Sequence, residues 1–386
     1  MSRKRTNPFV AALIGIFLIP ASVCLHAWNE YRTIHRTRGL QEAAEIVQSI
    51  PDPERVESKW DGTLVHLTGT AATDETLRDP IFGVEANGIK LHRNIEMYQW
   101  DEDSDTDDGR TSYSYRKVWR EGRIDSSQFE HSGHENPQLH FDQWQQTAGT
   151  VMVGKYRISD ALIQQKNDDQ SVRIDVEAIK QNIDESDAAK LSAYETGLYY
   201  SQSGQSASDP SIGDLKIRFS LVPNGPVSLM AGLSGNTFNA FHTSNGEPIE
   251  RLYPGTLSAQ QVIEKLKFEN TLMAWGLRAL GLILCLVGTM MIFSPAQALF
   301  RWVPLVGDIA GGMIFLVSVL FAICLSLTTI SISWIAVRPL LAISLLFVAG
   351  AAAYWIIRTR RGVQTSHPVP SNDDEPIMLT DDMMVS

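Results

Sequence analysis

Three apolar runs near the C-terminus constrain the fold of this 386-residue chain more than any other feature. They cover Leu272–Phe293, Ile309–Val337 and Pro339–Ile357, and together they contain one charged residue, Arg278. A helix needs about 20 apolar residues to cross the hydrocarbon core of a bilayer. The runs also lack the alternation of apolar and polar residues that is typical of membrane barrels. We therefore predict membrane helices at 271–293, 309–335 and 339–357.

A fourth apolar run lies near the N-terminus. It follows a short basic segment and contains no Lys, Arg, Asp or Glu between residues 6 and 29. A cleaved signal peptide would look similar, but its apolar core is usually shorter than this run. Residues 21–24 also form a poor lipoprotein cleavage site. The pattern favours a retained membrane helix at 8–28.

Residues 29–270, between the first and second spans, form a soluble acidic domain. The chain carries 44 acidic and 33 basic residues, and the whole of the acidic excess lies in this segment. An acidic domain argues against nucleic-acid binding, which requires a basic patch. The three cysteines, Cys24, Cys285 and Cys324, all lie in apolar runs, so we expect no disulfide in the domain.

Short runs rich in β-branched and aromatic residues predict that this domain is β-rich, with an α+β fold. A helical stalk is expected to continue the first span, and a helix from Ser258 is expected to run into the second. The runs Ile89–Trp100 and Thr111–Trp119 flank Asp108 and Gly109 and predict the central antiparallel pair of the domain, with the acidic residues 101–108 as its solvated tip. The core candidates on this hairpin are Ile95, Met97, Tyr113 and Tyr115.

Four spans place both termini on one side of the membrane. Basic residues cluster at both ends of the membrane-spanning region, and such residues accumulate on the cytoplasmic side. We therefore predict a multi-pass α-helical membrane protein with four spans and a large β-rich α+β extracytoplasmic domain between spans 1 and 2. The remaining segments are expected to be a cytoplasmic N-terminus at 1–7, a cytoplasmic loop at 294–308 and a disordered cytoplasmic tail at 358–386.

Arg278 lies about two turns into the second span, after Trp275. A charged side chain inside a membrane helix is a candidate functional residue, although near a helix end it can also reach the headgroups or pair with another helix. We therefore select Trp275 and Arg278 as candidate lipid-contacting or structural residues. Asp308 is expected on the opposite side of the membrane from Arg278. Gly307 and Gly311 form a small-xxx-small pair that favours close helix contact.

Two clusters resemble metal sites without meeting their requirements. His131, His134 and His140 could ligate a metal, but no cysteine or HExxH motif accompanies them, and a surface loop is the more typical setting. The acidic run resembles a calcium loop, yet its glycine comes one place late and Ser114 stands where a glutamate is needed. No phosphate-binding loop or nucleophile motif is present. We predict no catalytic residue, metal site or cofactor.

Several motifs resemble one known family. They are GTLVHLTG at 62–69, LRDPIFGV at 77–84, IKLHRNIEMYQW at 89–100, YSYRKVW at 113–119, GHENP at 133–137, IGDLKIRFS at 212–220 and AWGLRALG at 274–281. In this order they resemble the LUMA family, also called transmembrane protein 43, over most of the chain up to Arg358. The resemblance implies four spans, a large lumenal domain, self-association and no established catalytic activity. For animal members it implies the endoplasmic reticulum and inner nuclear membrane, with lamins and emerin as partners.

Together these observations predict a non-enzymatic integral membrane scaffold. Its expected partners are membrane lipids, other membrane proteins and further copies of itself in a homo-oligomer. Its expected location is the inner or plasma membrane in a bacterium, or the endoplasmic reticulum and inner nuclear membrane in a eukaryote. Two alternatives stay open. One is a lipid- or membrane-stress-sensing module, suggested by Arg278 and the stalk. The other is a membrane-tethered metal-dependent hydrolase that uses the three histidines.

Overall fold

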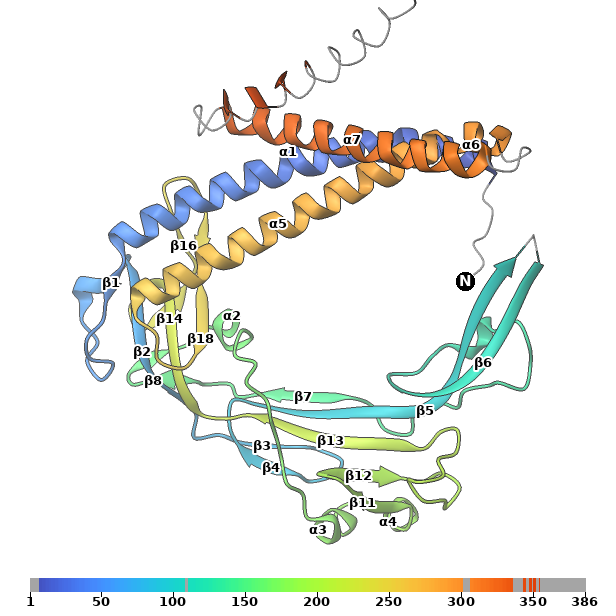
Figure 1. The fold of residues 1–386 in the computed structure, drawn as a ribbon. Coiled ribbons are helices and arrows are strands. Elements are labelled where there is room, and N and C mark those ends of the chain that lie inside the picture. Colours follow the sequence, from blue (N-terminus) through green and yellow to red (C-terminus); the bar gives the residue numbers. More distant parts are fainter. Residues whose placement is uncertain are drawn as a thin grey trace, which may run out of the picture.

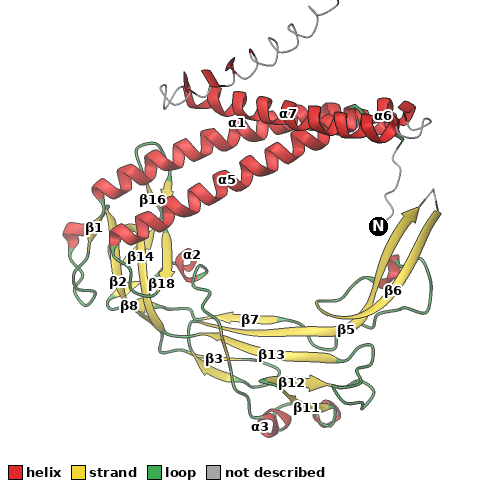
Figure 2. Ribbon diagram, viewed as in Figure 1, coloured by secondary structure: helices red, strands yellow, loops and turns green. Residues whose placement is uncertain are grey.

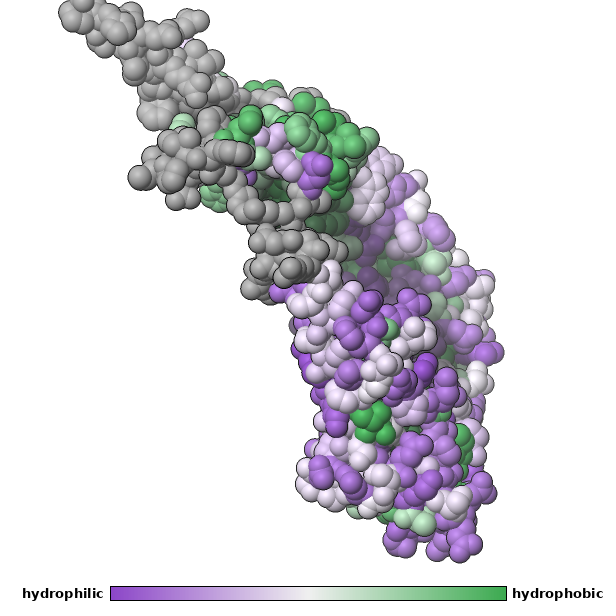
Figure 3. Space-filling view, turned by 90° about the vertical axis from the view of Figure 1, so that its right-hand side faces the viewer, coloured by the Kyte–Doolittle hydropathy of each residue, from purple (hydrophilic) through white to green (hydrophobic). Residues whose placement is uncertain are grey.

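The computed structural model describes residues 7–107, 110–300 and 306–335, together with a few helical residues between 343 and 354. Long helices lie along one side of the molecule, and β-strands curve away from one end of them, so that the chain forms an open arch (Figure 1). Helices and strands are almost fully segregated in this arrangement (Figure 2). Apolar residues gather over the helices, whereas the surface of the β-rich part is mainly hydrophilic (Figure 3).

Helix α1 (Pro8–Ile46) contains both the first apolar run and the predicted stalk. It begins with Pro8 at a position where proline is favoured, and the Asn7 side chain accepts a hydrogen bond from the backbone N–H of Phe9. Its 39 residues span about 58 Å at about 1.5 Å per residue, nearly twice the thickness of a bilayer core. The predicted continuity of stalk and first span is confirmed.

Helix α5 (Ala259–Ile292) likewise runs from the β-rich domain into an apolar segment, as predicted. A reciprocal pair of hydrogen bonds between Ser258 and Gln261 caps its first turn. Two further helices follow, α6 (Ser294–Phe300) and α7 (Val306–Ile335). Within the described residues, three helical segments are long and apolar enough to cross a membrane: α1, α5 and residues 311–333 of α7. The predicted fourth span at 339–357 lies mostly outside the described residues, as does the tail at 358–386.

The first sheet lies against the domain ends of α1 and α5. Its longest strands, β2 (Leu64–Ala72) and β14 (Gly225–Ser234), pair antiparallel along their length. Short strands join the far edges of this pair, so that the pairings close into a ring. Leu40 and Ala43 of α1 are buried together with residues of α5 and β14, which attaches the helices to the sheet. The other strands of this sheet are β1 (Gln48–Ser49), β8 (Met152–Val153), β9 (Tyr156–Arg157), β15 (Thr237–Asn239) and β18 (Arg251–Pro254).

The second sheet is built around β5 (Lys90–Asp107), the longest strand of the molecule. It pairs with β13 (Leu215–Val222) on one side, and with β7 (Trp144–Thr147) and β6 (Arg110–Glu121). The sheet also contains β10 (Gln170–Ser171), β11 (Leu191–Tyr194) and β12 (Gly197–Tyr200). The remaining short elements are β3 (Thr76–Arg78), β4 (Glu85–Asn87), β16 (Phe241–His242), β17 (Pro248–Ile249), α2 (Asp160–Ile163), α3 (Val176–Lys180), α4 (Glu185–Ala188) and the 3-10 turns Ser58–Trp60 and Ser126–Gln128.

The predicted hairpin is confirmed, because β5 and β6 pair antiparallel from Glu96 opposite Glu121 to Asp107 opposite Arg110. Two details of the prediction are wrong. The acidic residues 101–107 continue the strand instead of forming a loop, because residues of β6 pair with all of them. In addition, β5 is central in its sheet but β6 lies at the edge. Residues 108 and 109, the predicted turn, lie outside the described residues.

The position of β6 at the edge explains which core candidates are buried. Ile95 and Met97 of β5 are buried between neighbouring elements, as predicted. Tyr113 and Tyr115 of β6 are only half-buried, contrary to the prediction, because no further strand covers β6. The ring of Tyr115 instead stacks on His134, with 3.7 Å between the ring centres.

Candidate functional site

Helices α1 and α5 approach closely because glycines stand at their crossing. A methyl group added at Gly15 would lie 2.4 Å from the Gly288 carbonyl oxygen, which is a clash, and one added at Gly288 would lie 3.0 Å from Leu18, which is a tight contact. At Gly281 the same addition would come within 2.6 Å of the His26 ring. Small residues of this kind allow membrane helices to pack backbone against backbone. The close approach brings polar side chains from α1, α5 and α7 together between the helices.

An ion pair between Arg278 of α5 and Glu30 of α1 lies in this interface. The Arg278 Nε donates to Glu30 Oε1 at 2.6 Å and Nη2 donates to Oε2 at 2.9 Å, so the pair is bidentate. The Glu30 side chain is fully buried and that of Arg278 is 13% exposed. Trp275 lies beside the pair, with the Arg278 guanidinium carbon 5.0 Å from the centre of its ring. Trp275 itself is 63% exposed and faces outward.

Two further buried side chains extend this polar cluster toward α7. His26 Nε2 lies 3.0 Å from the Ser326 hydroxyl oxygen, and Asn29 Nδ2 donates to the Ala274 carbonyl at 3.1 Å. Among the described residues, His26 Nδ1 and Asn29 Oδ1 have no hydrogen-bond partner. An unpaired buried polar atom costs about 1–3 kcal/mol. We refer to His26, Asn29, Glu30, Arg278 and Ser326 as the polar cluster.

Only one member of the polar cluster was selected from the sequence. Arg278 was found because it is the one charge in an apolar run, whereas Glu30 was assigned to the soluble domain. A usable signal exists in the spacing of His26, Asn29 and Glu30, which places all three on one face of a helix. The Asp308 side chain lies outside the described part of the chain, so its predicted separation from Arg278 stays a prediction.

Beyond the polar cluster, a second group of contacts joins α1 to the segment between β16 and β17. Arg36 forms an ion pair with Glu247, whose side chain is only 10% exposed. Asn245 Nδ2 donates to the backbone carbonyl of His35 at 2.7 Å. A methyl group added at Gly39 would clash with the Glu247 side chain, so the two segments are in direct contact. We call Arg36, Asn245 and Glu247 the stalk clamp.

The three histidines considered as metal ligands lie in two different places. His131 and His134 both contact the ring of Tyr115. His140 Nε2 instead lies 2.9 Å from Asp187 Oδ1, which also accepts a hydrogen bond from the Tyr200 hydroxyl. Burial and the neighbouring carboxylate raise the pKa of Tyr200 to about 12. Across the described residues, no group of three or more His, Cys, Asp or Glu side chains is placed to hold a metal ion.

The long apolar helices, their internal ion pair and the attached sheets define an α-helical integral membrane protein with a large β-rich domain between its first two apolar helices. The family model described as Transmembrane protein 43 matches residues 97–339. A Drosophila melanogaster protein named Transmembrane protein 43 homolog is 31% identical over 377 residues, covering 93% of this chain and 97% of that relative. Human Transmembrane protein 43 is 28% identical over 370 residues, covering 91% of this chain and 89% of that relative.

The chain therefore belongs to the transmembrane protein 43 family, and the resemblance to LUMA proteins is confirmed. No solved structure matches the chain.

Proposed function

We propose that this protein is a non-enzymatic membrane scaffold that self-associates and arranges other membrane proteins and lipids around its β-rich domain. The observation that carries the proposal is the unbroken passage of α1 and α5 from the apolar region into the domain. The Glu30–Arg278 pair joins the two helices to each other, and the stalk clamp joins α1 to the domain. A connection of this kind holds the domain at a defined position relative to the bilayer, which a scaffold requires.

The proposal includes a topology of four spans with both termini in the cytoplasm and the domain on the opposite side. The basic residues at both ends of the membrane region support it. Single cysteines at Ser104 and Ser371, in a variant without the native cysteines, test this arrangement. An impermeant maleimide added to intact cells or sealed vesicles should label only the cysteine at Ser104 from the outside. Labelling of both positions from the same side would contradict the four-span topology.

Within this scaffold we assign structural roles to the two residues selected from the sequence. Arg278 holds α5 to α1 through Glu30, and Trp275 contacts lipid with its exposed ring. The geometry supports both assignments, since the guanidinium is mostly covered while the indole is 63% exposed. Tryptophan is enriched at the level of the lipid headgroups, where its ring is partly apolar and partly polar.

Self-association is proposed to use the apolar outer face of α7. A methyl group added at Gly311 would meet no atom within 4 Å among the described residues, and Phe315 and Leu316 nearby are at least half exposed. Cross-linking in native membranes followed by mass spectrometry tests this role. We expect cross-links between copies of the chain that decrease in the Gly311→Leu variant. The matched control is Gly276→Leu, an equally open glycine on α5. A wild-type chain that yields no such cross-links would contradict the scaffold proposal.

A further inference from the structure

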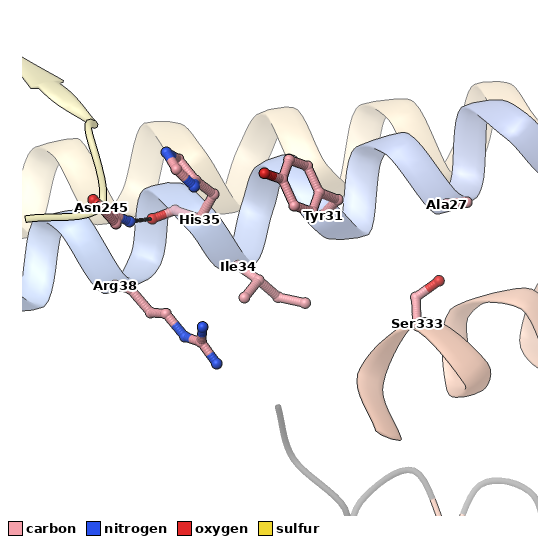
Figure 4. Close-up of a pocket in the computed structure, with 7 residues that line it drawn as sticks. All are labelled: Ala27, Tyr31, Ile34, His35, Arg38, Asn245 and Ser333. Carbon is pink, nitrogen blue, oxygen red and sulfur yellow. Dashed lines mark hydrogen bonds between the residues drawn. The ribbon is translucent and has the colours of Figure 1, made fainter. Parts of the chain in front are cut away.

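A pocket of about 460 Å³ lies between α1 and the C-terminal end of α7. Five of its lining residues come from successive turns of α1, one from the segment between β16 and β17, and one from α7 (Figure 4). These residues are Ala27, Tyr31, Ile34, His35, Arg38, Asn245 and Ser333. The pocket is separate from the polar cluster, with which it shares no residue.

The pocket lies at the level where the apolar segments end. Ala27 is next to the last residue of the predicted span 8–28, and Ser333 ends the apolar segment of α7. Trp28 and Tyr31 at the same level of α1 are 53% and 69% exposed. Exposed aromatic side chains of this kind are typical of the headgroup region of a bilayer. The pocket is therefore placed to receive part of a lipid at the membrane surface.

The lining of the pocket changes from apolar to basic along α1. Ala27 and Ile34 supply apolar surface near the membrane, whereas Arg38 lies farther along the helix toward the domain. Arg38 forms no hydrogen bond or ion pair with any residue that the structure describes, whereas Arg36, two residues earlier, is paired with Glu247. Glu247 also lies 3.9 Å from the His35 ring.

Besides Arg38, four polar residues line the pocket: Tyr31, His35, Asn245 and Ser333. The Ser333 hydroxyl donates to the Thr329 carbonyl, so its oxygen can only accept from a ligand. Arg38 has no acidic partner among the described residues, and it shares the pocket with an apolar wall. This combination matches a ligand with an anionic head and a hydrocarbon tail.

We propose that this pocket binds an anionic phospholipid, with its phosphate on Arg38 and its acyl chains beside Ala27 and Ile34. Guanidinium groups bind phosphate through strong charge-assisted hydrogen bonds. A zwitterionic phospholipid brings its own cation close to Arg38 and should bind less tightly. Free phosphate lacks the acyl chains that the apolar wall contacts. This site goes beyond the scaffold role, because neither self-association nor the topology requires it.

Native mass spectrometry of the full chain in detergent tests the proposal. The probes are phosphatidylglycerol, phosphatidylcholine of the same chain length, and inorganic phosphate. We expect the wild type to retain phosphatidylglycerol in preference to phosphatidylcholine, and Arg38→Gln to weaken phosphatidylglycerol binding about tenfold or more. Ala27→Phe should weaken it as well, because the larger side chain occupies the apolar part of the pocket. The matched control is Arg116→Gln, which removes the same charge from an exposed arginine of β6.

Three results would overturn the lipid assignment. The first is equal binding of the two phospholipids by the wild type. The second is phosphatidylglycerol binding that Arg38→Gln leaves unchanged. The third is inorganic phosphate binding as tightly as phosphatidylglycerol, which would make the pocket a site for the free anion. Because Arg38 is exposed, its variant is expected to fold, and its elution from a sizing column with the wild type verifies this.

Discussion

Individual residues of the membrane helices show how charge is tolerated in apolar surroundings. Glu30 is fully buried, and a carboxylate in such a place is costly unless it is paired and hydrogen-bonded. Arg278 supplies both a counter-charge and two hydrogen bonds in the bidentate geometry that its planar guanidinium favours. The pair therefore does more to determine how α1 and α5 fit together than to raise stability above that of an apolar alternative.

Replacing Arg278 by Met tests the pair, because Glu30 then keeps its burial and loses both bonds from the guanidinium. We expect the free energy of unfolding to fall by about 3–5 kcal/mol, and the double variant Glu30→Gln/Arg278→Met to recover most of this loss. Thermal unfolding in nanodiscs measures both. Arg116→Gln, at an exposed ion pair of the hairpin, should change little. Equal melting temperatures for the single and double variants would show that the two residues are not coupled.

A buried histidine in the soluble domain should make stability depend on pH. His66 of β2 is 5% exposed, and its Nε2–H donates to the Leu257 carbonyl at 3.0 Å. Burial holds the pKa of His66 below its ordinary value of 6.5, although the bond to Leu257 opposes this. The contribution of His66 to the free energy of unfolding is therefore complete above pH 6.5. It is lost as the pH falls below that value, because His66 binds a proton more readily in the unfolded chain than in the folded one.

We therefore expect the melting temperature of the wild type to fall more steeply between pH 7 and pH 5 than that of His66→Gln, in which no imidazole must be protonated. Melting curves across this range measure the difference. His242→Gln, at an exposed histidine, should keep the slope of the wild type. If the melting temperatures of the wild type and His66→Gln changed equally with pH, His66 would not be the source of the pH dependence.

At the scale of elements, the β5–β6 hairpin depends on its base more than on its acidic end. Gln99 of β5 is fully buried, and its Nε2 donates to the Gly122 carbonyl at 2.6 Å while its Oε1 accepts from the Ile124 N–H at 2.7 Å. One side chain thus holds the end of β6 and the segment that follows. Toward the far end, Asp105 and Ser112 are exposed, and the described contacts are the strand ladder and weak bonds such as that from the Ser112 hydroxyl to the Asp105 carbonyl.

Gln99→Leu should therefore destabilise the domain, because it leaves the Gly122 carbonyl and the Ile124 N–H without their partner. At about 1–3 kcal/mol for each unpaired group, the melting temperature should fall by several degrees. Deleting residues 106–107 and 110–111 together should change it little, because the strands keep their register. Thermal unfolding measures both variants. If Gln99→Leu left the melting temperature unchanged and the deletion lowered it, the hairpin would depend on its acidic end and not on its base.

At the scale of the whole molecule, the arch is held by a few contacts between the helices and the β-rich domain. The domain ends of α1 and α5 share a buried apolar cluster with β14, and the stalk clamp adds an ion pair at the side of α1. The second sheet runs below the helices without touching them in the ribbon view, and the β5–β6 hairpin turns back toward the helical side of the arch (Figure 1). The angle between helices and domain therefore depends strongly on the stalk clamp.

Glu247→Gln should loosen this angle, because it removes the charge that Arg36 contacts. Spin labels at Ser104 on β5 and Leu299 on α6, both exposed, measure it as a distance distribution in a chain without native cysteines. We expect a broader distribution in Glu247→Gln than in the unmodified background. Glu42→Gln is the control, because half-buried Glu42 accepts a hydrogen bond from Ser244 of the same segment and has no ion pair among the described residues. An unchanged width in Glu247→Gln would mean that the apolar cluster alone sets the angle.

The sequence by itself determined what depends on neighbouring residues. Runs of apolar residues long enough to cross a bilayer identified the three long apolar helices of the described residues. The alternation in Ile89–Trp100 identified most of β5 with its buried Ile95 and Met97. Arg278 was identifiable because a single charge in an apolar run is costly inside a membrane unless it is paired or reaches the headgroups. The length of an apolar run and the alternation of a strand are each properties of one element. They can therefore be recognised in the sequence without knowledge of the tertiary structure.

Only the tertiary structure decided which elements meet. Glu30 lies 248 positions from Arg278, and although its spacing from His26 and Asn29 indicates a polar helix face, nothing in its own segment identifies the partner of that face. The alternation around Tyr113 and Tyr115 is that of a strand with one covered face, but their strand lies at the edge of the sheet, where the rings of His131 and His134 pack on them and leave them half-exposed. Pairing and coverage depend on the free energy of packing distant segments together, which the local pattern of either segment does not contain.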